Sequence, residues 1–177
     1  MNTSKLFGDA KVDKLVETLE SMDSKLGIIV EALSVSSPTV PTETPETELD
    51  SNAWMRPAES FIGLDEDADE AQVIEFSQTA GTPIASSETP WCAIFVNAIL
   101  AMAGLKTTGT MRARDFADYG LECEEKVGAI VVYKSHVGFV PEIGKVLGGN
   151  QSDGVNIGEQ SWYGTPIAYR WPTKKKG

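Results

Sequence analysis

The sequence predicts an α+β domain that follows a heptad helix and an extended linker. Apolar residues recur at heptad spacing between residues 12 and 33. Residues 36–53 are rich in Pro, Thr and Glu and almost lack apolar side chains. In residues 54–172, helix-like patterns come first, and short β-rich runs separated by glycines follow. Helices followed by strands in one globular segment are typical of the α+β class.

The heptad segment predicts a coiled-coil helix over residues 1–35. Its apolar residues alternate at spacings of three and four and occupy the a and d positions: Val12, Leu15, Leu19, Met22, Leu26, Ile29 and Leu33. A single helix with so narrow an apolar stripe is not stable alone in water. We expect self-association first and docking on another protein second. Docking on the chain's own domain is a third alternative.

The segment over residues 36–53 is interpreted as a flexible tether, because it contains Pro38, Pro41 and Pro45 and too few apolar residues to form a core. The globular domain is expected over residues 54–172. Lys174, Lys175 and Lys176 lie in a basic, solvated tail over residues 173–177.

The domain pattern predicts helices followed by an antiparallel meander. The expected helices cover residues 57–63, 67–79, 91–103 and 111–119. The expected strands lie within residues 129–133, 137–141, 146–147, 155–157 and 167–169. The helix over 91–103 is apolar around nearly its whole circumference, so it is expected to be buried.

Composition disfavours several classes of function. The formal net charge is -11, and such an acidic surface repels nucleic-acid backbones. No apolar run is long enough to span a membrane, and the first residues lack the apolar core of a secretory signal, so synthesis in a cytoplasm is expected. In that setting the two cysteines are expected to be free thiols.

The same composition offers little for other kinds of site. One histidine and two distant cysteines give no zinc-ligand spacing, so no metal or other cofactor is expected. The acidic runs Asp65–Asp67 and Glu124–Glu125 are interpreted as solvated faces, and a glycosidase based on paired carboxylates has no positive support.

Cys92 is the candidate nucleophile. Pro90 favours a helix start, which places Cys92 in the first turn of the expected helix over 91–103. The free N–H groups and partial positive charge of a helix N-terminus stabilise a thiolate, so the pKa of Cys92 is expected to fall. The same N–H groups can stabilise an oxyanion on an attacked carbonyl. A small buried core cysteine is the alternative.

His136 is the only histidine, so it is the only available imidazole base. It begins an expected strand, and a Cys-His pair supports nucleophilic catalysis when a third polar group orients the ring. Asn150 is the strongest candidate for that group, because it follows the next strand and returns near His136 in a hairpin. An ordinary Gly-Gly-Asn turn is an equal alternative for Asn150. Gln151 and Asp153 are weaker candidates.

These motifs together resemble a phage-associated family of small NlpC-type and CHAP-type papain-like cysteine peptidases. The resemblance covers roughly residues 55–172 and excludes the heptad segment and the tether. It rests on these segments, which occur in the family's order: Glu88–Ala93, Phe95–Asn97, Ala103–Leu105, Gly128–Val132, His136–Phe139, Gly148–Asp153 and Tyr169–Pro172.

The resemblance implies a papain-like fold and cleavage of peptide or amide bonds in bacterial peptidoglycan. It implies Cys92 as nucleophile, His136 as base and Asn150 as the orienting residue. Trp91, Glu88 and Gln151 are the implied substrate-binding residues, and a packing role is the alternative for Trp91.

The leading hypothesis is a phage-encoded peptidoglycan hydrolase that is made in the host cytoplasm, acts on the cell wall and is anchored to an assembly by its N-terminal helix. The alternative is a virion or tail protein that assembles through the coiled coil and carries a weak or inactive hydrolase domain. A third hypothesis is a glutaminase- or transglutaminase-like acyl transferase. No feature of the sequence indicates the site for an acyl acceptor that such an enzyme needs.

Overall fold

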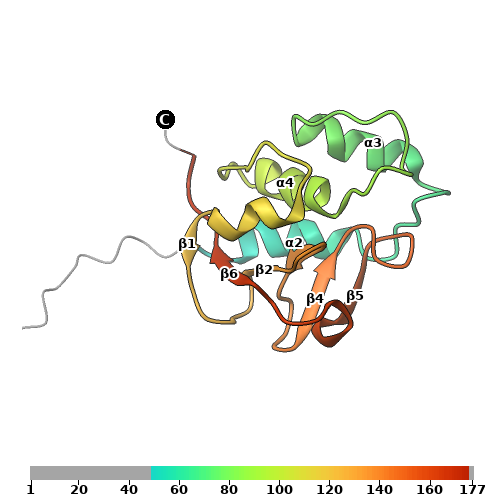
Figure 1. The fold of residues 1–177 in the computed structure, drawn as a ribbon. Helices are drawn as coiled ribbons and strands as arrows, with labels where there is room; N and C mark the ends of the chain where they lie inside the picture. The colour runs from blue at the N-terminus through green and yellow to red at the C-terminus, as the bar shows by residue number, and fades with distance from the viewer. Residues whose placement is uncertain (1–48, 176–177) are drawn as a thin grey trace, which may run out of the picture. The chain divides into compact units, whose positions relative to one another are not determined.

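A computed structural model describes residues 49–175 of the chain (Figure 1). The predicted heptad helix over residues 1–35 and the linker up to residue 48 lie outside the described residues. The described part is an α+β domain in which helices pack on a small antiparallel sheet, as the sequence predicts.

Three α-helices and two short 3-10 helices are described: α2 (Asn52–Ser60), α3 (Glu70–Thr79), α4 (Cys92–Met102), η1 (Ala113–Asp118) and η2 (Gln160–Tyr163). The six strands are β1 (Leu121–Glu122), β2 (Ile130–Val132), β3 (Val137–Phe139), β4 (Lys145–Gly148), β5 (Asn156–Glu159) and β6 (Ala168–Trp171). They form one sheet of order β1-β6-β2-β3-β4-β5, and every pairing is antiparallel. Strands β2 to β5 form a meander as predicted. The strand expected within 167–169, which is β6, does not continue it but pairs with β2 and β1.

Helix α4 lies at the centre of the core, between α3 and strands β3 and β4 (Figure 1). Its residues from Cys92 to Leu100 are all buried, as the all-round apolar pattern predicts. Because the helix is held on both sides, its first residue has a fixed position beside the beginning of β3.

Helix α2 begins earlier than the expected span of 57–63. Trp54, Met55 and Ala58 form its buried face, and the indole Nε1 of Trp54 donates to the carbonyl of Gly128 at 2.8 Å. Burial of this face favours a helix start at Asn52 over a start at Pro57. Pro57 therefore lies inside the helix, where it removes only one backbone donor.

The segment over 111–119 also differs from expectation, because only residues 113–118 are helical and they form a 3-10 helix. The first residues of the expected tail are paired with the domain: the amide of Lys106 donates to the carbonyl of Thr173 at 3.0 Å, and Lys174 bridges Leu105. The described fold thus extends two residues beyond the predicted boundary at 172.

Candidate active site

The predicted nucleophile, Cys92, is the first residue of α4, and Trp91 is its N-cap. Its side chain is buried, with 5 % exposed. Backbone N–H groups of Val137, Ala93 and Cys92 itself lie at the sulfur and favour its thiolate. Two of these groups are free because they belong to the first turn of a helix.

Burial nevertheless raises the pKa of the Cys92 thiol above its ordinary value, because desolvation outweighs the backbone N–H groups of Val137, Ala93 and Cys92. The expectation that the helix N-terminus lowers this pKa is therefore wrong. The N–H groups are present as expected, but the helix start lies inside the core, and the sequence does not show how deeply.

His136 directly precedes β3, and its carbonyl accepts a hydrogen bond from the amide of Tyr133 at 2.8 Å. The next residue, Val137, pairs with Val132 in β2 and brings its own N–H to the sulfur of Cys92. The structure therefore places the backbone next to His136 at the sulfur of Cys92.

Gln151 is the side chain that bonds the imidazole, with 2.9 Å between His136 Nε2 and Gln151 Oε1. The orientation of the Gln151 amide is fixed, because its Nε2 donates to the carbonyl of Asn156 at 2.6 Å and to Asn156 Oδ1 at 3.1 Å. Since Oε1 can only accept, His136 carries its proton on Nε2. Its Nδ1 is then the unprotonated nitrogen that can accept a proton.

Asn150, expected to orient His136, bonds a different partner. Its Nδ2 donates to Glu66 Oε2 at 3.1 Å, and its backbone has a φ of 56°, in the left-handed region that asparagine tolerates in turns. Asn150 therefore lies in a turn, which is the alternative given for it above. The side chain that bonds His136 is instead that of Gln151, the weaker candidate. Asp153 is exposed in the same turn with a φ of 57°.

Two glycines allow the turn to approach the site closely. A Cβ on Gly148 would lie 3.1 Å from His136 Nε2, and one on Gly149 would lie 2.3 Å from Cζ3 of Trp91. Backbone without side chains therefore separates the Trp91 indole from the His136 imidazole. Trp91 is fully buried, so it is a wall of this site rather than an exposed substrate contact. Glu88 is exposed in the loop before it.

Burial lowers the pKa of His136 to about 4, although the hydrogen bond that His136 Nε2 donates to Gln151 opposes the shift. Because the pKa of the Cys92 thiol is raised, both groups are neutral near pH 7. Burial thus disfavours both the thiolate of Cys92 and the imidazolium of His136.

Tyr163 is a site residue that the sequence analysis did not find. Its ring stacks on the imidazole of His136, with 4.1 Å between centroids and 13° between planes. Tyr163 is half-buried in η2, and its ring covers one face of the buried imidazole. The neighbouring Trp162 is 68 % exposed. An aromatic pair between two glycines, Gly158 and Gly164, is the only signal in the sequence that marks this segment.

The acidic runs interpreted as solvated faces contain two carboxylates that bond residues distant in the sequence. Glu66 accepts the indole N–H of Trp91 at 2.8 Å in addition to the bond from Asn150. Glu125 accepts the amide of Gly144 at 2.7 Å and the Nε2 of Gln160 at 2.6 Å. Both contacts join segments distant in the sequence, which is why the local pattern does not show them.

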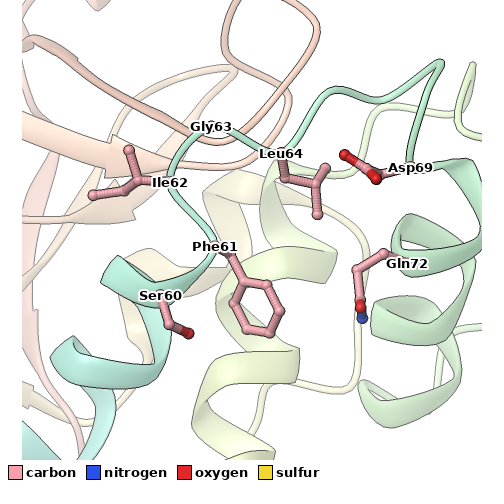
Figure 2. A pocket seen from close by; sticks show the side chains of 7 residues that line it. All are labelled: Ser60, Phe61, Ile62, Gly63, Leu64, Asp69 and Gln72. Atoms are coloured by element: carbon pink, nitrogen blue, oxygen red, sulfur yellow. The ribbon is translucent and has the colours of Figure 1, made fainter.

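A separate hollow of about 320 Å³ lies between the end of α2 and the beginning of α3 (Figure 2). It is lined by Ser60, Phe61, Ile62, Gly63, Leu64, Asp69 and Gln72. None of the residues around the Cys92 sulfur lines it. Its walls include a single carboxylate, from Asp69, and no Cys or His side chain.

Within residues 49–175, no group of three or more His, Cys, Asp and Glu side chains is arranged to hold a metal ion. None of the helices in the same range has the length and apolar character needed to cross a membrane. Comparisons with protein-family models, with curated proteins and with solved structures found no match for this chain.

Proposed function

We propose that the chain is a papain-like cysteine hydrolase of the NlpC/CHAP type that cleaves a peptide or amide bond in bacterial peptidoglycan. The observation that carries this proposal is the arrangement at the start of α4. There, the sulfur of Cys92 faces three backbone N–H groups, one of them from Val137, next to His136. Gln151 fixes the tautomer of that imidazole. The choice of peptidoglycan as substrate rests on the motif resemblance.

The proposed reaction uses the tautomer of His136 that has its proton on Nε2 and leaves Nδ1 free to accept one. Nδ1 of His136 accepts the proton of the Cys92 thiol as the sulfur attacks the substrate carbonyl, and the oxygen develops negative charge. Free N–H groups at the start of α4 are placed to donate to that oxygen. The imidazolium then gives its proton to the leaving amine, which leaves a thioester on Cys92. Water, deprotonated by His136, hydrolyses the thioester and restores the thiol.

The proposed setting is a phage protein made in the host cytoplasm that acts on the cell wall. The heptad pattern over residues 12–33 supports anchoring to an assembly, either through self-association or through a structural protein of the virion. Light scattering during size-exclusion chromatography of the full chain tests self-association, and a monomer at micromolar concentration contradicts it.

The function is tested by digesting purified peptidoglycan with the full chain and analysing the soluble fragments by mass spectrometry, which also identifies the bond that is cut. We expect Cys92→Ala to abolish fragment release while the fold, followed by circular dichroism, is retained. Cys123→Ala is the matched control, because Cys123 is the other free cysteine and lies outside this site. Equal release by Cys92→Ala and the wild type would refute the proposed mechanism.

A further inference from the structure

Glu66 connects the two segments that carry the proposed catalytic groups. A single carboxylate oxygen, Oε2, accepts the indole N–H of Trp91 at 2.8 Å and the side-chain N–H of Asn150 at 3.1 Å. Trp91 directly precedes Cys92, and Asn150 directly precedes Gln151. One atom thus holds the neighbour of the nucleophile and the neighbour of the residue that orients the base.

We infer that Glu66 is a positioning residue of this site, which sets the separation between Cys92 and the His136–Gln151 pair through its bonds to Trp91 and Asn150. We call Glu66, Trp91 and Asn150 the Glu66 clamp. The inference rests on the proposed function for its catalytic consequence, while its structural consequence can be measured without any substrate.

The backbone around Glu66 is itself fixed. The amide of Glu66 donates to the carbonyl of Asp153 at 2.8 Å, and the amide of Val155 donates to the carbonyl of Leu64 at 3.0 Å. The approach is so close that a Cβ on Gly154 would lie 2.3 Å from the oxygen of Leu64. The loop before α3 is therefore paired with the turn that contains Gln151. This pairing keeps the backbone of Glu66 next to that turn.

The indole of Trp91 is held on its other sides by packing. It is fully buried, its ring stacks near Phe76 and meets Phe95 edge-on, and it contacts the backbone of Gly149. Its N–H is its only polar group, and a buried donor without an acceptor is costly. Without Glu66, the indole has to move toward solvent or leave its N–H unpaired, and either change alters the wall behind His136.

The experiment compares kcat and KM for peptidoglycan fragments in the full chain and six variants. Glu66→Ala removes both bonds, and we expect kcat to fall about 10- to 100-fold with little change in KM, because small misplacements of reacting groups reduce the rate by such factors. Glu66→Gln keeps an oxygen that can accept both bonds, and we expect a loss of about threefold or less, since a neutral acceptor is weaker than a carboxylate. Trp91→Phe removes one donor and keeps an aromatic ring in place.

Asp67→Ala is the matched control. Asp67 is exposed in the same loop, and its carboxylate accepts no hydrogen bond from the described part of the chain, so we expect wild-type kcat. In the double variant Glu66→Ala/Trp91→Phe, the losses should not add, because both changes break the same bond. The inference is overturned if Glu66→Ala has the same kcat as Asp67→Ala. It is also overturned if Glu66→Gln loses as much kcat as Glu66→Ala.

If Glu66→Ala does not fold, the test uses the two donors separately. An unchanged kcat in both Trp91→Phe and Asn150→Ala then overturns the inference.

A measurement on the single histidine separates this inference from the proposed function. Nitrogen-15 NMR of the ring reports the tautomer, and we expect a proton on Nε2 in the wild type, Glu66→Gln and Asp67→Ala, and a mixture of tautomers in Glu66→Ala. If the wild type cleaves no peptidoglycan, the proposed function fails, but this NMR comparison still tests whether the Glu66 clamp positions His136. In that case, identical ring-nitrogen shifts in the wild type and Glu66→Ala refute it.

Discussion

The fold should lose stability between pH 7 and pH 5 because of one buried imidazole. His136 is 5 % exposed, and burial lowers its pKa from 6.5 to about 4. The unfolded chain therefore binds a proton at this residue over a range of pH in which the folded chain does not. By linkage, the free energy of unfolding decreases as pH falls through 6.5 and continues to decrease until the folded protein is protonated near pH 4.

The size of the effect follows from the two pKa values. Each unit of difference corresponds to about 1.4 kcal/mol, so the full contribution is about 3 kcal/mol. At pH 7 almost none of it is lost, and at pH 5 about 2 kcal/mol is lost. This is a large fraction of the roughly 5–15 kcal/mol that stabilises an ordinary domain.

The assay is urea unfolding followed by tryptophan fluorescence at pH 7, 6 and 5, in the wild type and in His136→Gln. The variant removes the titrating ring, and its Nε2 can still donate toward Oε1 of Gln151. We expect the wild type to lose about 2 kcal/mol more than the variant between pH 7 and pH 5. Equal losses in the two proteins would show that His136 is not buried in its neutral form and would refute the account of the resting site.

Three further predictions follow from the same geometry. Gln151→Ala removes the acceptor for His136 Nε2, and we expect kcat to fall about 100-fold, measured on peptidoglycan fragments; an unchanged kcat contradicts the role of Gln151. In a Cys123→Ala background, the rate of Cys92 alkylation by iodoacetamide should keep rising with pH beyond 9, because burial raises the thiol pKa; a plateau between pH 5 and 8 would instead indicate an ion pair. Gly149→Ala places a Cβ 2.3 Å from the Trp91 ring, and we expect about 1–3 kcal/mol of destabilisation in urea unfolding, which a wild-type midpoint would contradict.

Features that depend on local pattern could be predicted from the sequence. The all-round apolar run after Cys92 predicts a buried helix, and α4 is one. The β-rich runs between glycines predict the meander from β2 to β5. The predicted start of α2 at Pro57 is wrong. The helix begins earlier, at Asn52, because its first turns bury Trp54.

Features that depend on long-range contact could not be predicted in the same way. The choice between Asn150 and Gln151 depends on the left-handed backbone at Asn150, which turns its side chain to Glu66. Tyr163 reaches His136 only because η2 returns over the site after β5. The direction of the Cys92 pKa shift depends on the depth of the helix start, which no spacing of residues encodes.

The burial of the proposed catalytic pair connects its electrostatics to substrate access. A thiol and a neutral imidazole are the low-energy forms only while water is excluded and no negative charge is being formed. Attack on a carbonyl moves that charge from sulfur to an oxygen that helix N–H groups can stabilise, so proton transfer to His136 becomes favourable during attack and not before it. For that attack, the carbonyl must come within about 3–3.5 Å of the sulfur. The thiol of Cys92 would then lose its proton only once a carbonyl is in place to be attacked.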